Sequence, residues 1–393
     1  MSEHLHYFAT PQRGTAVMLP FELEAWLQQW AGLRLTMVKA VPPPFSREEW
    51  AYLVTFLEAA NLRKPFSTAF GETVPDLPGR PNALVRPRGL IGVWLPNNVS
   101  LLGSLTLILA SLSGAALWVK AGSSAADLTA AWVDFALRHL PPGSLADYLR
   151  QQVQINRFDR HDPRNGQMAA AAKVRVAFGS DEAVSAVHAL PHPTDSVAVS
   201  FGNHRSEAWV EKAALTEDQM LALIRVFAIH GQAGCTSPRR VVVLDGSLDD
   251  ARWVQSELVR LWPKAVRADV PMHVAAANVM EHQMAAAQGW QAVRVARNAG
   301  VVAVGPPGLP ELAGIMTLPV VPAQVVDAMA ALPPNIQTIG HAVRHPHDPL
   351  WLERISRTPA KRFVPLEAMH HFGTVWDGAN YWRQFFEEVE WQT

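Results

Sequence analysis

The chain contains a single cysteine, Cys235, within residues 231–237, which read GQAGCTS. One thiol can form neither an internal disulfide nor a cysteine zinc site. Cys235 is therefore a packed small hydrophobe, an incidental thiol or a nucleophile. Its neighbours are small and polar, and the apolar run Val241–Val243 that follows predicts a strand. The thiol is thus predicted at a turn between elements, where functional groups tend to collect.

Polar side chains also follow two apolar runs in the first half of the chain. Asn97 and Asn98 come after the run that ends at Leu95, and Lys120 ends the next run. Either amide could donate to an oxyanion, and Asn98 would also suit a helix N-cap. Lys120 is either a functional cation or a solvated strand terminus.

Two further junctions carry glycine or hydroxyl groups. Gly179 and Ser180 stand where a predicted strand passes into a helix, and Ser200 with Gly202 ends a later strand. Glycine and the first amides of a helix can approach a phosphate, although a plain tight turn has the same pattern. None of these sites identifies an enzyme by itself.

These residues are positioned by strands that alternate with helices. Thr216 and Gln219 form a predicted capping box at the start of one helix. Alternation of this kind predicts parallel sheets built from βαβ units, in an α/β protein with more than one lobe. Residues 1–88 are rich in proline and are predicted to be irregular or to form a wrapping arm, apart from a helix over 47–60. From residue 90 onward, the predicted strands are 90–95, 115–119, 174–178, 196–200, 240–244 and 301–304, and the predicted helices are 99–112, 124–138, 182–190, 217–229, 249–261 and 322–331.

The composition excludes several functional classes. The 393 residues include 34 Lys and Arg against 35 Asp and Glu, so no overall charge favours nucleic acid or an anionic membrane. Residues 101–118 are apolar, but the serines and Gly114 within them favour a buried helix and a strand over a membrane span. One cysteine and an N-terminus without signal-peptide features predict a cytoplasmic protein.

The order of the short runs resembles the aldehyde dehydrogenase superfamily and, within it, the LuxC-type acyl-CoA reductases, from about residue 90 to 377. This resemblance implies that Asn97 is the oxyanion amide and Cys235 the nucleophile. It also implies that Lys120 touches the adenosine ribose or its 2′-phosphate, while Gly179 and Ser180 lie near the cofactor pyrophosphate. The matching runs are LPNN (95–98), LWVK (117–120), AFGS (177–180), GQAGC (231–235), and RFVPL (362–366) with VWDG (375–378).

Two departures from the superfamily pattern refine this resemblance. Hydrolytic aldehyde dehydrogenases have a glutamate in a Glu-Leu-Gly-Gly run, and here Ser200 stands at that position. Without that base, an acyl group is expected to be exchanged with a thiol rather than with water. Glu311 lies near the position at which the superfamily has a glutamate that steadies the nicotinamide ribose, although the register is imperfect.

The resemblance implies a Rossmann-type cofactor domain and a second α/β catalytic domain. Residues 89–205, completed by 345–393, would bind the nicotinamide, and residues 206–344 would carry Cys235. The expected reaction is NADPH-dependent reduction of an acyl-CoA or acyl-carrier thioester to an aldehyde, with NADH as the other cofactor. Partners implied are an acyl-protein synthetase and further copies of the chain, with no nucleic acid.

Other functions remain open from the sequence. The scaffold could oxidise aldehydes or reduce acyl phosphates, or it could be a silent interaction subunit. The chain has 14 tryptophans, and the aromatic run 381–386 could form an interface or pack in the core. His341, His345 and His347, with the pair His370 and His371, are interpreted as surface or structural histidines rather than metal ligands. His230 could assist the thiol.

Overall fold

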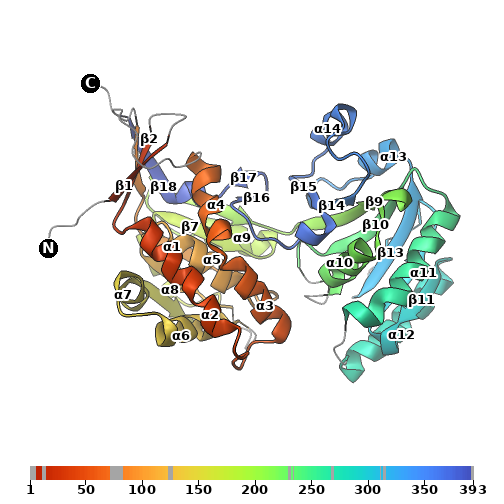
Figure 1. The fold of residues 1–393 in the computed structure, drawn as a ribbon, viewed down its shortest axis with the longest axis horizontal. Helices are drawn as coiled ribbons and strands as arrows, with labels where there is room; N and C mark the ends of the chain where they lie inside the picture. Colours follow the sequence, from red (N-terminus) through yellow and green to blue (C-terminus); the bar gives the residue numbers. More distant parts are fainter. Residues whose placement is uncertain are drawn as a thin grey trace. The chain divides into compact units, whose positions relative to one another are not determined.

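The computed structural model describes residues 6–10, 15–70, 83–122, 127–228, 232, 234–266, 270–309, 311–312 and 316–390. The chain divides into two compact units. Unit 1 contains Met1–Gly202 and Phe372–Thr393, and unit 2 contains Asn203–His371. Figure 1 shows unit 1 in red to yellow with a blue return segment, and unit 2 mainly in green to blue.

A five-stranded parallel sheet forms the centre of unit 1. The strand order is β6-β5-β4-β7-β8, so β4 pairs with β5 on one side and with β7 on the other. The direction of winding therefore reverses between β4 and β7, and open sheets of this kind bind ligands beyond the carboxyl ends of their strands. The bounds are β4 Ile91–Trp94, β5 Leu117–Lys120, β6 Val153–Asn156, β7 Val174–Phe178 and β8 Val197–Phe201.

Helix α5 (Leu102–Ser111) is buried along almost its whole length. The Trp382 indole donates to the Leu109 carbonyl at 2.9 Å, and the Trp30 indole donates to Ser111 Oγ at 3.2 Å. Segments from both ends of the sequence thus cover this helix, which explains its apolar character. No helix among the described residues is both long and apolar enough to cross a membrane.

The N-terminal region is more regular than its proline content predicts. Four helices occupy residues 23–70, and the predicted helix over 47–60 is two helices, α3 and α4. Ser46 and Glu49 form a capping box at the start of α3. The prediction of an irregular arm is therefore wrong for this segment, because buried tryptophans such as Trp26 and Trp30 dock the helices on the unit. The bounds are α1 Leu23–Gly32, α2 Arg34–Met37, α3 Arg47–Phe56 and α4 Ala59–Phe70.

The remaining elements of unit 1 complete its layers. A second sheet has the order β1-β2-β3-β18, in which the last strand pairs antiparallel with β3. Trp382 and Phe385 are fully buried, so the aromatic run 381–386 packs in the core. The bounds are β1 His6–Thr10, β2 Thr15–Leu19, β3 Ala83–Pro87, β16 Val375–Trp376, β17 Ala379–Asn380, β18 Phe386–Glu390, α6 Thr129–His139, α7 Ser144–Gln151, α8 Arg164–Ala171 and α9 Asp181–His188.

Unit 2 is built on a seven-stranded sheet of order β11-β12-β13-β10-β9-β14-β15. Only β11, at one edge, is antiparallel to its neighbour among these strands. The alternating valines of β10 point to opposite faces of the sheet, as strand geometry requires. The bounds are β9 Arg205–Val210, β10 Pro238–Leu244, β11 Gln291–Val295, β12 Gly300–Val304, β13 Thr317–Ala323, β14 Ile336–Ala342 and β15 Arg362–Pro365.

Helices cover both faces of this sheet (Figure 1). Val241 and Val243 pack with α10 and α11 on one face, and Val242 and Leu244 pack with α12 and α13 on the other. The capping box of Thr216 and Gln219 at the start of α10 is confirmed. The bounds are α10 Glu217–Ala228, α11 Leu248–Ala265, α12 Met272–Ala287, α13 Val325–Ala330 and α14 Pro349–Ser356.

Several predicted boundaries differ from the structure, and two of them change the element or unit to which residues belong. The predicted helix over 322–331 begins too early, because Pro322 and Ala323 still belong to β13 and the helix starts at Val325. Residues 345–371, expected to complete the cofactor domain, belong to unit 2, because β15 extends the sheet beside β14. The predicted strand over 174–178 is confirmed to the residue as β7.

Candidate active site

Cys235 lies in a turn between α10 and β10 of unit 2, and its side chain is half-buried. The position in a turn confirms what the small neighbours predicted. Ser206 Oγ donates to the Cys235 carbonyl at 2.6 Å, and the Ser237 amide donates to the Gly234 carbonyl at 3.0 Å. The backbone on both sides of the thiol is therefore fixed by hydrogen bonds.

Gln232 anchors the same segment on the side before the thiol. It has a left-handed backbone with φ of 61° and is 2% exposed. Its amide nitrogen donates to the Thr317 carbonyl of β13 at 3.1 Å. The Gln232 side chain thus connects the turn that carries Cys235 to strand β13 of the sheet. Sequence reasoning missed the role of Ser206, since it lies 29 residues from Cys235.

Glu311 lies at the same end of the sheet of unit 2. It forms an ion pair of 2.7 Å with Arg205, the residue immediately before Ser206. Pro238, three residues after Cys235, is the register partner of Ser206 between β10 and β9. The structure therefore brings Glu311 and Cys235 to the same end of the sheet, where β9 and β10 begin. Glu311 is exposed there.

The other sequence-predicted residues lie in unit 1, where each follows the carboxyl end of a strand. Asn97 follows β4, Lys120 ends β5, and Gly179 follows β7. A Cβ placed on Gly122 would lie 3.0 Å from the side-chain oxygen of Asn97. The segments after β4 and β5 thus meet at the edge where parallel sheets bind ligands.

Asn98 is not the N-cap of the helix that follows it, which was the structural role considered from the sequence. Helix α5 begins at Leu102, and its N-cap position is Leu101, with no side-chain cap bond. Both amides are exposed. The helix-cap interpretation is therefore wrong, and the two asparagines lie in the loop between β4 and α5.

Lys120 is half-buried rather than a solvated strand terminus. Its ammonium lies 5.6 Å from the centroid of the Phe158 ring, within the range of a cation–π contact. Burial lowers the pKa of Lys120, and the Asp159 carboxylate acts in the opposite direction. A desolvated cation at a strand end is well placed to meet an anionic ligand.

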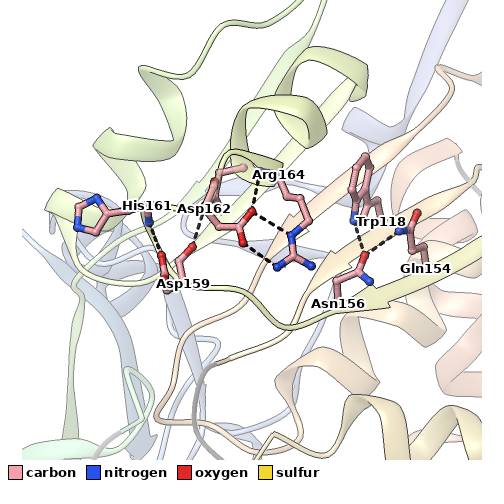
Figure 2. Close-up of polar contacts among 8 residues, drawn as sticks. Trp118, Gln154, Asn156, Asp159, His161, Asp162 and Arg164 are labelled. Carbon is pink, nitrogen blue, oxygen red and sulfur yellow. Dashed lines mark hydrogen bonds and ion pairs between the residues drawn. The ribbon is translucent and has the colours of Figure 1, made fainter.

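The loop after β6 contributes Phe158 and Asp159 to the surroundings of this lysine and was missed by the sequence analysis. Figure 2 shows polar contacts of this loop and of the neighbouring strands. Asn156 accepts hydrogen bonds from Trp118 Nε1 at 2.9 Å and Gln154 Nε2 at 2.8 Å. Asp162 and Arg164 pair at 2.6 Å, and hydrogen bonds from Arg164 lower the pKa of Asp162 to about 2. The polar run 156–164 directly after a strand is the signal that could have revealed it.

Gly179 has φ of +156°, a conformation that favours glycine. A Cβ there would lie 3.1 Å from the Cβ of Ala183. Ser180 caps α9, accepting from the Ala183 amide at 3.3 Å. The junction is therefore a compact strand-to-helix turn directly after the carboxyl end of β7.

Ser200, expected from the sequence at the position of the glutamate of hydrolytic aldehyde dehydrogenases, lies next to the last residue of β8. Its hydroxyl lies 2.7 Å from Nε2 of His188, which is the last residue of α9. Burial lowers the pKa of His188, and the neighbouring Arg175 adds to the effect. This position therefore supplies a hydroxyl next to an imidazole, and not a carboxylate that could act as a general base.

Among the other histidines, His341 and His347 lie close enough to interact electrostatically. His341 lies in β14, where burial lowers its pKa. His230 lies outside the described residues, so its assistance to the thiol stays a prediction. Within the described part of the chain, no group of three or more His, Cys, Asp or Glu residues could hold a metal ion.

Solved structures share this fold at low sequence identity. Aldehyde dehydrogenase 21 from Physcomitrella patens matches 93% of this chain and 84% of its own, with 14% identity and a TM-score of 0.63. An NAD-dependent benzaldehyde dehydrogenase from Corynebacterium glutamicum gives the same coverage and identity with a TM-score of 0.60. Proline utilization A matches at 15% identity and a TM-score of 0.61, and the chain spans 42% of its length.

No curated protein sequence matches the chain. The structural matches establish an aldehyde-dehydrogenase-like fold, as predicted. A family model described as acyl-CoA reductase (LuxC) matches residues 82–386, which is most of the chain. The chain belongs to the LuxC acyl-CoA reductase family, an oxidoreductase family, and has the fold of aldehyde dehydrogenases.

Proposed function

We propose that the protein reduces an acyl thioester to an aldehyde with NADPH, through a thioacyl intermediate on Cys235. The observation that carries this proposal is the half-buried thiol in a turn fixed by Ser206 and Gln232. A nucleophile needs a fixed position and access to substrate, and this turn provides the first while leaving the side chain partly exposed. Family membership supports the substrate class.

In the proposed first step, the Cys235 thiolate attacks the acyl carbonyl. A bond forms between Sγ and the acyl carbon, and the bond to the donor sulfur then breaks, releasing the donor as a thiol after proton uptake. The Asn97 amide and the backbone N–H of Cys235 donate to the oxyanion during both events. The product of this step is a thioester of the enzyme itself.

The chemistry that a nicotinamide would supply when bound is the hydride needed in the second step. The chain then needs to hold the thioacyl carbonyl in place and to stabilise the oxyanion again, using the same two donors. Collapse of the resulting thiohemiacetal breaks the bond to Sγ and releases the aldehyde. Cys235 is thereby restored as a thiolate.

The carboxyl edge of unit 1 fits a dinucleotide. The strand order has a switch point between β4 and β7, and Gly179 leaves a backbone junction without a Cβ beside it. We propose that Gly179 and Ser180 face the pyrophosphate and that Lys120 meets the adenosine ribose or its 2′-phosphate. Glu311 is proposed to hold the nicotinamide ribose.

Removing the Lys120 charge tests the proposed preference for NADPH. Lys120→Met is expected to raise the KM for NADPH by about 10–100-fold, since a charge-assisted hydrogen bond is worth about 1.5–3 kcal/mol. The KM for NADH should change by less than about threefold, since NADH has no 2′-phosphate. Steady-state kinetics with both cofactors measures the two values. Lys173→Met, which removes another lysine of unit 1 paired with Asp195, is the matched control.

An equal loss with both cofactors would contradict the assignment of Lys120 to the 2′-phosphate. It would instead indicate that Lys120 contacts a part of the cofactor that NADPH and NADH share. The control variant should keep both KM values, because Lys173 is an exposed ion-paired side chain.

The presence of serine at position 200 supports reduction of the acyl-enzyme by hydride over its hydrolysis by water. Its hydroxyl contacts His188, and no carboxylate is supplied by this position. Ser200→Glu is therefore expected to speed hydrolysis of the acyl-enzyme by at least about tenfold, because a positioned general base contributes about 10²–10⁴-fold. Release of free fatty acid from acyl-CoA without nicotinamide measures this rate.

Ser200→Gln is the control for that change, since glutamine has the same size as glutamate but cannot accept the proton. Equal hydrolysis in the two variants would show that water activation does not depend on a base at this position. A rise confined to Ser200→Glu would support the proposed division between reduction and hydrolysis.

The overall reaction is tested by measuring NADPH consumption over a panel of acyl thioesters while trapping the aldehyde with a hydrazine. One aldehyde for each NADPH consumed supports the proposal. NADP⁺ reduction by an aldehyde without any thiol would indicate an aldehyde oxidiser. Turnover of acyl phosphates and not of thioesters would indicate an acyl-phosphate reductase with the same fold. Absence of nicotinamide binding would indicate a silent subunit.

The acyl donor is proposed to be coenzyme A or an acyl carrier, with an acyl-protein synthetase as a candidate source. We also propose that the enzyme acts in the cytoplasm as a homo-oligomer. The aromatic run 381–386 does not provide the interface considered from the sequence, since Trp382 and Phe385 are buried within unit 1. Size measurement by light scattering tests the oligomer.

A further inference from the structure

His370 connects the two sides of the segment that carries Cys235. Its Nε2 atom lies 2.5 Å from the Val226 carbonyl of α10, before the segment. Its Nδ1 atom lies 2.5 Å from the Thr236 hydroxyl, immediately after Cys235. One imidazole therefore contacts both Val226 and Thr236, which are ten residues apart in the sequence. His370 itself lies 134 residues after Thr236.

The carbonyl partner determines the role of Nε2. A carbonyl oxygen only accepts, so Nε2 must carry the proton in the bond to Val226. The Thr236 hydroxyl can both donate and accept, so it bonds Nδ1 in either protonation state of the ring. Thr236 is 6% exposed, so this bond lies away from water, where losing a partner is costly.

His370 is itself held in place by its own neighbours. Arg362 of β15 donates to the carbonyls of Met369 and His371, at 3.3 and 3.2 Å. Leu366 and Met369 are fully buried in the core that includes Phe227 of α10. The imidazole thus projects from a rigid support onto the Cys235 turn.

We infer that His370 is a positioning residue for Cys235, acting through the Thr236 hydroxyl; this rests on the proposed role of Cys235 as nucleophile. The Ser206 bond fixes the Cys235 carbonyl, and the Thr236–His370 bond fixes the next side chain. Together they fix the peptide between Cys235 and Thr236, which holds the Cys235 backbone and its thiol in one orientation. A small displacement of an attacking atom lowers rates strongly, so this bond should influence acyl transfer.

The test compares variants that break the bond with variants that keep it. Thr236→Val removes the hydroxyl at nearly constant volume, and Thr236→Ser retains it. His370→Leu removes both ring partners, and His370→Gln keeps a neutral donor and acceptor. We expect Thr236→Val and His370→Leu to slow acyl transfer from acyl-CoA by about 10–100-fold, and the two conservative variants to stay within about threefold of wild type.

A double-mutant cycle identifies the bond as the cause. If the two groups act through one contact, Thr236→Val combined with His370→Leu should be no slower than the slower single variant. Losses that multiply would overturn the inference, because they would indicate two independent effects. Equal loss in the conservative and disruptive variants would overturn it as well. NADPH affinity and the thermal midpoint, measured alongside, identify a variant that fails to fold.

Alkylation of the lone thiol gives a readout that needs no turnover. Because Cys235 is the only cysteine, iodoacetamide incorporation reports on this turn alone. Release of the turn should raise the alkylation rate in Thr236→Val by at least about threefold, and Thr236→Ser should match wild type. Unchanged alkylation in Thr236→Val would overturn the positioning role. A wild-type enzyme that never forms an acyl adduct would instead refute the proposed function while leaving this measurement valid.

Discussion

Cys235→Ala is expected to abolish the covalent acyl adduct and to lower thioester reduction by at least about 10⁴-fold, as loss of a nucleophile does in other covalent enzymes. Wild-type protein incubated with acyl-CoA and no nicotinamide should gain the mass of one acyl group. The residual rate would reflect binding and oxyanion stabilisation alone. Intact mass spectrometry measures the adduct, and NADPH consumption measures the rate.

Cys235→Ser separates chemistry from packing, because it keeps the size of the side chain while supplying a much weaker nucleophile. It should bind NADPH as wild type does and form little adduct. Wild-type protein that carries no adduct with any thioester would refute the thioacyl mechanism. Adduct formation in Cys235→Ala would place the acyl group on another residue.

Asn97→Ala is expected to lower the rate of acyl transfer by about 10²–10³-fold, which is the usual effect of removing one oxyanion donor. The physical reason is that the amide interacts with charge that develops only in the transition state. The loss should therefore appear in kcat, with KM for the thioester changed by less than about threefold. Stopped-flow release of coenzyme A under single-turnover conditions isolates this step.

Asn98→Ala is the matched control, since the two asparagines are neighbours in the loop after β4 and both are exposed. Neither provides the cap of α5, so neither substitution should destabilise that helix. Comparable losses in the two variants would indicate that the loop as a whole matters. A loss confined to Asn98→Ala would reassign the oxyanion amide by one residue.

The alternation of elements was predictable because apolar runs of four to six residues in this chain are buried on both faces of a parallel sheet. Strand β12, for example, reads GVVAV and is buried at every position, and such strands have continuous apolar sequences. The edge strand β11 was missed for the opposite reason, since most of its residues are exposed. Propensity alone gives little signal for such a strand.

The polar partners of the candidate site could not be derived from local sequence. Ser206, Thr236 and His370 meet only after the sheet of unit 2 has formed, and their spacing along the chain follows no short motif. His370 was interpreted as a structural histidine, and its two bonds agree with that while adding a specific task. Lys120 shows the same limit, because its burial depends on Phe158 from another loop.

The return of the C-terminal segment to unit 1 has a consequence for biosynthesis. Strand β18 pairs with β3, so Phe386 meets Pro87 about 300 residues after that partner is made. At a typical translation speed of about 5–20 residues per second, the edge of β3 waits about 15–60 s for its partner. Unit 2 is continuous in sequence and can complete its sheet on the ribosome during that interval. The nascent chain therefore presents an open β-edge, which is a natural binding surface for a chaperone.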